Sequence, residues 1–354
     1  MAKTKTLLII TQKVDINDDV LGFFHRWLEK FSEKLEKLYV ICLSEGEHHL
    51  PKNVVVYSLG KEKGFSKIRK FFRLQKFLLR YIREVDGVFI HMGTIYAIAS
   101  FPLAKIFKKR LILWYVHRSL NLGLKIAEKC VDKILTASKE GCRLKNRKKI
   151  DILRHGIDTE FFKPDYNKND TNKKFKILSV GRIAPIKDQA TLIEAIDLLI
   201  NQKNIIDFEV KFIGSSLEDY EKKYLEQVKN LVEEKKLADF VEFLGGMPQQ
   251  EIAGFYQESD VFVNLCPTGG LDKAVLEAMA CGIPVLVCNE AFRKDLGSYA
   301  DELIFQEKNP DDLARKILNL RNLNITEMAR YLRNQVVQNH NLDNLIDKII
   351  NVFK

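Results

Sequence analysis

The feature of this sequence that most constrains its fold is a regular alternation of short apolar runs with helix-like segments. Helical stretches such as 19–35 and 66–84 separate most of the runs in the first half. Runs of Val, Ile and Leu without polar alternation are typical of strands that are buried on both faces of a parallel sheet. The runs of the first half are Leu7–Thr11, Leu38–Leu43, Val54–Leu59, Gly87–His91, Arg110–Val116 and Lys133–Thr136.

The alternation restarts after a polar segment at 165–174, which is rich in Asn, Asp and Lys and is typical of a linker. We therefore predict an α/β protein with two doubly wound domains, at 1–165 and 166–335, and a C-terminal helix in 336–354 that could pack back on the first domain. Ligands of such sheets bind at the carboxyl ends of the strands. The predicted strands of the second half are Phe175–Val180, Phe208–Ile213, Val241–Leu244, Val261–Leu265 and Pro284–Cys288.

The charge is divided unevenly between these halves. Residues 1–165 contain 33 Lys and Arg against 18 Asp and Glu, whereas residues 166–354 contain 24 against 29. A basic half is suited to nucleic acid, to an anionic membrane or to a phosphorylated substrate. Nucleic acid is disfavoured, because no nucleic-acid-binding motif occurs and the aromatic residues of the most basic segment lie on its apolar side.

That basic segment is the predicted helix at 66–84, which has seven cations and no acid between Lys67 and Arg83. Its apolar residues fall on one helical face and its cations form another stripe. This is the pattern of a helix that lies on an anionic membrane surface. The alternative is a helix whose apolar face covers the sheet and whose basic face is solvated.

The remaining composition is that of a cytoplasmic protein. No stretch approaches the ~20 apolar residues that span a membrane, and the run at 7–10 is too short for a signal peptide. The six cysteines include no C-x-x-C pair, which is unlike a zinc knuckle. We expect reduced thiols, no metal site, and a location in the cytoplasm that includes the inner face of the membrane.

Two segments of the second domain have the residues of a phosphate site. In the first, the predicted strand 175–180 runs into Gly181, which allows a sharp turn, and then into Arg182 and Lys187. Arg offers a fork of donors and Lys a point charge at the end of the strand, where a phosphate would bind. The alternative is that both are ordinary surface cations.

The second segment follows the predicted strand 261–265. Gly269, Gly270 and Leu271 form a loop that opens a helix, where free N–H groups and the helix dipole favour an anion. Glu277 lies one turn into this helix and could accept hydrogen bonds from two ribose hydroxyls. The alternative for Glu277 is a solvent-facing helical side chain.

These motifs together resemble glycosyltransferase family 4. The resemblance is carried by Gly-Arg-x4-Lys at 181–187, by Leu-Glu-Ala-Met-Ala-Cys-Gly-x-Pro-Val at 276–285 and by weaker similarities at 155–162, 243–247 and 255–263. The family contains retaining enzymes that use nucleotide sugars and have the GT-B fold of two Rossmann-like domains, with the active site in the cleft between them. The resemblance is best over residues 150–310.

The resemblance implies roles for individual residues. Arg182 and Lys187 would bind the donor diphosphate in place of a metal ion, Glu277 the ribose, and the backbone near Gly245 and Met247 the base. His117, at the end of the predicted strand 110–116, resembles the family histidine that faces the donor sugar. His91 ends the neighbouring strand and is a second catalytic candidate, although a lone histidine is more often structural.

The chain also departs from the family pattern. The family has two glutamates eight residues apart; Glu277 matches the second, but position 269 is Gly. Asp272 in the same loop is a candidate catalytic replacement, and its alternative is a helix N-cap.

We predict a hexosyltransferase that needs no cofactor and moves a sugar from a UDP or GDP sugar to a lipid-linked or cell-envelope glycan. The alternatives are a nucleotide-sugar epimerase of the same fold and a non-catalytic sugar-nucleotide-binding protein.

Overall fold

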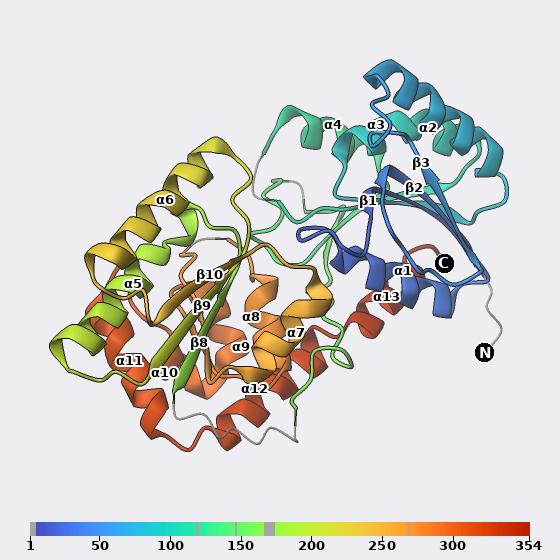
Figure 1. The fold of residues 1–354 in the computed structure, drawn as a ribbon. Helices are drawn as coiled ribbons and strands as arrows, with labels where there is room; N and C mark the ends of the chain where they lie inside the picture. The colour runs from blue at the N-terminus through green and yellow to red at the C-terminus, as the bar shows by residue number, and fades with distance from the viewer. Residues whose placement is uncertain (1–4, 118–119, 146, 166–173, 268) are drawn as a thin grey trace. The chain divides into compact units, whose positions relative to one another are not determined.

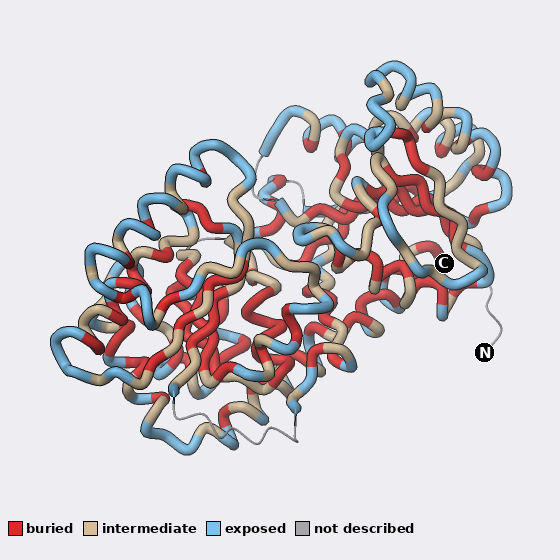
Figure 2. The backbone as a smooth tube through the Cα atoms, in the orientation of Figure 1, coloured by how far each residue is buried: buried red, intermediate tan, exposed pale blue. Residues whose placement is uncertain are grey.

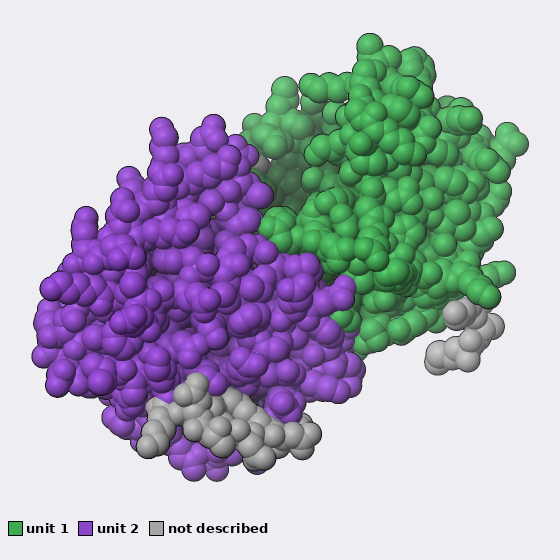
Figure 3. All heavy atoms as spheres, in the orientation of Figure 1, with its two compact units in different colours: residues 1–156, 342–354 green, residues 157–341 purple. Residues whose placement is uncertain are grey.

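The computed structural model describes residues 5–117, 120–145, 147–165, 174–267 and 269–354. It divides into two compact units, which Figure 3 shows in green and purple. Unit 1 comprises residues 1–156 and 342–354, and unit 2 comprises residues 157–341. Both are built on parallel sheets, as the sequence predicts.

The boundary between the units differs from the sequence-based one at 165/166. Ile157 and Phe162 are buried in the core of unit 2, so the chain enters this unit before the polar segment. The N–H of Ile157 donates to the carbonyl of His340 at 2.7 Å, which joins the two ends of unit 2. The part of the predicted linker at 166–173 lies outside the described residues.

Unit 1 contains a seven-stranded sheet with the order β3-β2-β1-β4-β5-β6-β7. Six of its seven strands coincide with predicted ones. The seventh, β7, was not predicted because only three residues form it. The strands are β1 (Thr6–Val14), β2 (Lys37–Glu45), β3 (Val54–Ser58), β4 (Gly87–His91), β5 (Arg110–Trp114), β6 (Lys133–Thr136) and β7 (Ile150–Ile152).

Helices cover both faces of this sheet, because successive residues of its strands point to opposite sides. Leu8 and Ile10 of β1 pack into the core beneath α2, α3 and α4, while Leu7 and Ile9 pack into the core beneath α1 and α13. Figure 2 shows the sheet as the buried interior of the unit. The helices are α1 (Phe23–Lys34), α2 (Lys67–Tyr81), α3 (Thr94–Ile106), α4 (Leu122–Cys130) and α13 (Leu342–Asn351).

Two details of unit 1 refine the sequence analysis. The helix predicted at 19–35 begins only at Phe23, because the Asp18 carboxylate accepts hydrogen bonds from the N–H groups of Val20 and Leu21 and holds them in a turn. The C-terminal helix α13 packs against α1, and Lys34 of α1 forms an ion pair with Asp347 of α13 at 2.7 Å.

Unit 2 contains a five-stranded parallel sheet with the order β10-β9-β8-β11-β12. It has one continuous core. α5 contacts α6 and α11, while α8 contacts α12; Figure 1 labels these elements. The strands are β8 (Phe175–Val180), β9 (Phe208–Ile213), β10 (Val241–Gly245), β11 (Val261–Asn264) and β12 (Val285–Val287).

All five strands of unit 2 coincide with predicted ones, since each is an apolar run between helices. The helices of unit 2 that follow residue 288 were not predicted. The helices of unit 2 are α5 (Gln189–Asp197), α6 (Asp219–Glu234), α7 (Gln249–Glu258), α8 (Lys273–Ala280), α9 (Arg293–Leu296), α10 (Ala300–Leu303), α11 (Pro310–Asn322) and α12 (Thr326–Asn339). Within the described residues, no helix combines the length and the apolar character that crossing a bilayer requires.

Candidate functional site

The candidate site lies where the strand order of unit 2 reverses. From β8 the chain moves outward to β9 and β10, and then returns to β11 on the other side of β8. In open parallel sheets this reversal leaves a crevice at the carboxyl ends of the two strands, and ligands bind there. The segments after β8 and β11 are the two that the sequence analysis selected.

The strands β8 and β9 end in a close approach of two backbones. The N–H of Gly181 donates to the carbonyl of Ile213 at 2.9 Å, and Gly214 follows with a φ of +154°. A Cβ at position 214 would lie 1.9 Å from the carbonyl oxygen of Gly181. Only glycine therefore fits at position 214, a residue that the sequence analysis did not select.

The side chain of Lys187 lies beside this turn. A Cβ at Gly181 would lie 3.8 Å from its Nζ, so the lysine side chain extends over the end of β8. Nζ of Lys187 donates to the carboxylate of Asp272, which also accepts from Nδ2 of Asn264 at 3.2 Å. The structure thus joins the β8 segment to the β11 segment through one ion pair.

The ionisation of this pair follows from its surroundings. Burial opposes the charge of Lys187, but Asp272 outweighs it and raises the pKa of the ammonium. Burial likewise opposes the charge of Asp272, but Lys187 and the hydrogen bond from Asn264 lower the pKa of the carboxyl below its usual value. Both groups are therefore charged at neutral pH.

Asp272 occupies the N-cap position of α8, but its side chain does not make the hydrogen bond of a helix cap. Its carboxylate bonds to Lys187 and Asn264 instead. Asp272 therefore has the position that the N-cap alternative expects, and its carboxylate also pairs with Lys187. The structure thus places the Asp272 carboxylate beside Lys187, one of the two cations that the sequence analysis expects to bind phosphate.

Arg182, the second predicted cation, is paired as well. Its Nη1 donates to Oε1 of the buried Glu221 of α6 at 2.7 Å, while 48% of the arginine side chain is exposed. Glu221 also accepts from the N–H groups of Leu217 and Glu218. The buried Glu221 carboxylate thus fixes the orientation of the Arg182 guanidinium through Nη1. The remaining N–H groups of the guanidinium can still donate to a ligand.

Glu277 is buried in α8 and is not the solvent-facing side chain of the alternative interpretation. Its Oε1 accepts from Nε2 of Gln249 at 2.9 Å and its Oε2 from the hydroxyl of Tyr256 at 3.2 Å. Burial raises the pKa of Glu277, although Lys273 and these two hydrogen bonds oppose the shift. Burial also lowers the pKa of Lys273 to about 7.

The segment expected to meet the base is connected to Glu277. Gly245 ends β10 with a φ of +76° and its carbonyl accepts from the N–H of Gly214. Met247 packs against the core of unit 2 in the loop that leads into α7. Because Gln249 is the first residue of α7, its hydrogen bond fixes this loop relative to Glu277.

The glycine loop before α8 is anchored by Leu271, which is buried in the core of unit 2. Gly269 has a φ of +125°, which L side chains rarely adopt, and Gly270 follows it. A glutamate at position 269 would strain this backbone. A glycine at position 269 therefore suits the local conformation.

The two candidate histidines belong to unit 1. His91 ends β4, next to β1, where the strand order of unit 1 reverses, but its ring is buried. The ring stacks on Phe24 with the centroids 3.9 Å apart, and Nδ1 lies 3.1 Å from Oγ1 of Thr11. These contacts are those of a structural histidine and lend no support to its predicted catalytic role.

His117 has the opposite environment. It lies just after β5 and is exposed, and its ring centroid is 6.3 Å from that of Tyr115. Its predicted role stays a prediction.

Sequence analysis missed four polar residues of the site: Asn264, Glu221, Gln249 and Tyr256. Asn264 had a usable signal, because it is the polar last residue of an otherwise apolar buried strand. The other three lie on helices. Tyr256 falls in the segment 255–263 that resembles the family, but no role was predicted for it, and Glu221 and Gln249 gave no signal in the sequence. Among the described residues, no three His, Cys, Asp or Glu side chains gather closely enough to hold a metal ion.

Comparison with known proteins identifies the second half of the chain. The family model described as glycosyl transferases group 1 matches residues 158–339. An uncharacterized glycosyltransferase of Methanocaldococcus jannaschii is 26% identical over 81% of this chain and 80% of its own length. The Escherichia coli UDP-Gal:α-D-GlcNAc-diphosphoundecaprenol α-1,3-galactosyltransferase is 27% identical over 58% of this chain, which spans 54% of that enzyme.

For several other curated relatives, the chain spans only 33% to 38% of their length. Among solved structures, that of Anabaena Alr3699/HepE in complex with UDP is similar with a TM-score of 0.77 at 15% identity. It covers 98% of this chain and 99% of its own. At this identity the likeness concerns the fold, which is that of two parallel α/β domains.

Proposed function

Because the chain belongs to the family of group 1 glycosyl transferases, we propose that it transfers a sugar from a nucleoside diphosphate sugar to a hydroxyl group of a lipid-linked or cell-envelope glycan. The observation that carries the proposal is the meeting of Lys187, Asp272 and Asn264 where the strand order of unit 2 reverses. There the donor diphosphate would contact Lys187 and Arg182, and its ribose would contact Glu277.

In this reaction the bond between the anomeric carbon and the diphosphate oxygen breaks, and its electron pair leaves with the diphosphate. The acceptor hydroxyl forms the new bond to that carbon, and its proton passes to the leaving diphosphate. Lys187 and Arg182 would stabilise the charge that develops on the leaving diphosphate. We propose that these fixed cations act without a metal ion. We also propose retention of configuration, which is the stereochemistry of the family that the motifs resemble.

The donor is of the UDP or GDP type in this proposal. It is supported by the structure of the similar Anabaena protein, which was determined with UDP, and by the named UDP-galactose donor of the Escherichia coli relative. A thermal-shift screen of nucleoside diphosphates and their sugars, followed by donor turnover with and without an acceptor, tests it. Release of an altered sugar without an acceptor would indicate an epimerase, and binding without turnover a non-catalytic protein.

Asp272 gives the first specific prediction. Asp272→Asn removes a carboxylate that pairs with Lys187 and repels a diphosphate, so we expect nucleoside diphosphate to bind as tightly as before or more tightly. If Asp272 is the catalytic carboxylate of the loop, turnover of the bound donor should fall by about 10²–10⁴-fold, as on loss of a positioned acid or base. Calorimetry and single-turnover rates separate the two effects. Unchanged turnover would remove Asp272 from the mechanism.

The acceptor part of the proposal places the chain at the inner face of the cell membrane. Several relatives carry names of lipid substrates, such as the diphosphoundecaprenol of the Escherichia coli enzyme. In α2, Leu74, Leu78 and Tyr81 are buried, so the helix does cover the sheet. However, Ile68, Phe72 and Leu79 remain exposed beside the six cations of α2. We propose that this exposed row rests on an anionic bilayer surface.

Co-sedimentation with lipid vesicles measures this second prediction. We expect vesicles containing phosphatidylglycerol to bring down several times more wild-type protein than neutral phosphatidylcholine vesicles do. Ile68→Asp should remove most of the difference, because it places a carboxylate in the apolar row. Ile206→Asp is the matched control, since Ile206 is similarly exposed but lies in unit 2. Equal recovery with both vesicle types would contradict membrane binding through α2.

A further inference from the structure

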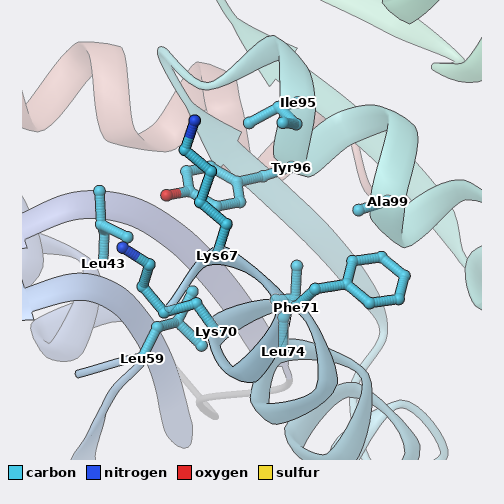
Figure 4. A pocket seen from close by; sticks show the side chains of 9 residues that line it. All are labelled: Leu43, Leu59, Lys67, Lys70, Phe71, Leu74, Ile95, Tyr96 and Ala99. Carbon is cyan, nitrogen blue, oxygen red and sulfur yellow. The ribbon is translucent and has the colours of Figure 1, made fainter. Parts of the chain in front are cut away.

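We propose that a pocket between α2 and α3 of unit 1 binds the hydrocarbon chain of a lipid-linked acceptor next to its phosphate. The pocket has a volume of about 250 Å³. Figure 4 shows it from close by, with the side chains that line it. This inference rests on the proposed function, because it assumes that the acceptor is lipid-linked.

The place of the pocket in the fold favours a ligand site. Leu43 of β2 and Leu59, which follows β3, form its floor near the carboxyl ends of the unit 1 strands. Tyr96 and Ala99 come from α3, which follows β4. Ligands of parallel sheets bind at these ends of the strands. The pocket is therefore on the functional edge of the sheet and not on a helical outer surface.

The lining of the pocket is apolar apart from two lysines and the hydroxyl of Tyr96. Leu74 forms part of its wall from within α2, and the half-exposed ring of Phe71 forms its rim. One hydroxyl and two ammonium groups are few partners for the many hydroxyl groups of a sugar. A volume of 250 Å³ is also below the ~300 Å³ at which pockets for whole drug-sized ligands begin. A segment of hydrocarbon chain fits both the chemistry and the size.

The two lysines determine which lipid class would fit. Lys67 and Lys70, both from the first turns of α2, line the pocket, and in Figure 4 their ammonium groups project away from the ring of Phe71. They are two of the seven cations of a segment without acids. A hydrocarbon chain that ends in a phosphate or diphosphate would place its anion near these ammonium groups. Charge complementarity thus selects an anionic lipid over a neutral one.

The probe for this site is dodecyl phosphate, kept below the concentration at which it forms micelles and titrated calorimetrically into the whole chain. We expect binding of dodecyl phosphate, weaker binding of a neutral dodecyl amphiphile and no measurable binding of inorganic phosphate. Ala99→Trp should weaken dodecyl phosphate binding at least tenfold by filling the pocket. Lys67→Gln with Lys70→Gln should weaken it about tenfold, whereas Lys76→Gln, exposed on the same helix, should have little effect.

A second variant protects the test against misfolding of the Ala99 variant. Ile95 borders the pocket and is 69% exposed, so Ile95→Asp should fold and should weaken dodecyl phosphate binding at least tenfold. Ile106→Asp is its matched control, because Ile106 ends the same helix and is 70% exposed. Equal binding by these two variants would overturn the proposal.

The outcomes separate this proposal from the others. If the protein binds anionic vesicles but does not bind dodecyl phosphate, α2 rests on a bilayer and the pocket holds no lipid chain. If neither binds, both ideas about unit 1 fail. In each of these cases nucleoside diphosphate binding by unit 2, measured on the same preparation, decides separately whether the proposed transferase function stands.

Discussion

Lys187→Met should weaken the binding of a nucleoside diphosphate more than a hundredfold. The substitution removes a charge-assisted hydrogen bond to the diphosphate, and such a bond contributes about 1.5–3 kcal/mol. It also leaves Asp272 without the cation that it pairs with in the unliganded site. The uncompensated carboxylate would then repel the incoming diphosphate, so the loss exceeds that of one contact.

The same reasoning predicts that a second substitution partly restores the affinity for the nucleoside diphosphate. In the double variant Lys187→Met, Asp272→Asn both charges are gone, so affinity should lie between those of the wild type and the single lysine variant. Thermal stability should follow the same order, because an unpaired and partly buried carboxylate is costly. Lys203→Met, which alters an exposed lysine of unit 2, is the control. Wild-type affinity in Lys187→Met would show that the diphosphate binds elsewhere.

Glu277→Gln should weaken nucleoside diphosphate binding about ten- to a hundredfold without loss of stability. A carboxylate accepts both ribose hydroxyls as charge-assisted hydrogen bonds, and the amide that replaces it accepts through one oxygen only. Stability should hold or increase, because burial already raises the pKa of Glu277 and so disfavours its charged form in the folded state at neutral pH.

This combination separates a binding role from a structural one. If Glu277 served only to hold Gln249 and Tyr256 in place, its substitution would lower the melting temperature together with the affinity. Calorimetry with the best-bound nucleotide and a melting curve of the free protein give the two quantities. Glu194→Gln, an exposed carboxylate of α5 in the same unit, is the matched control.

The architecture could be predicted from the sequence because it depends on a repeated pattern. Each apolar run such as Val261–Leu265 is typical of a strand that is buried on both faces, and such strands predict a parallel sheet. The candidate ligand site was then expected at the carboxyl ends of these strands. The boundary between the units could not be predicted in the same way. It depends on Ile157 and Phe162 entering the core of unit 2, and no local composition marks that contact.

The site was predictable in part for similar reasons. Glycine-rich turns and cations at strand ends selected Lys187, Arg182 and Glu277. The hydrogen-bond partners of these residues could not be predicted. Glu221 is 39 residues from Arg182 in the sequence, and Gln249 is 28 residues from Glu277. The stacking of His91 on Phe24 is likewise a tertiary contact, and no local pattern in the sequence indicates it.

The central claim is that the carboxyl-end site of unit 2 binds the diphosphate of a nucleotide sugar. It is tested most directly by calorimetric titration of the whole chain with UDP and with GDP, beside uridine and guanosine. We predict that one of the diphosphates binds, that its nucleoside binds at least tenfold more weakly, and that Lys187→Met abolishes the difference. Failure of both diphosphates to bind the folded protein, or equal binding of nucleoside and diphosphate, would contradict the claim.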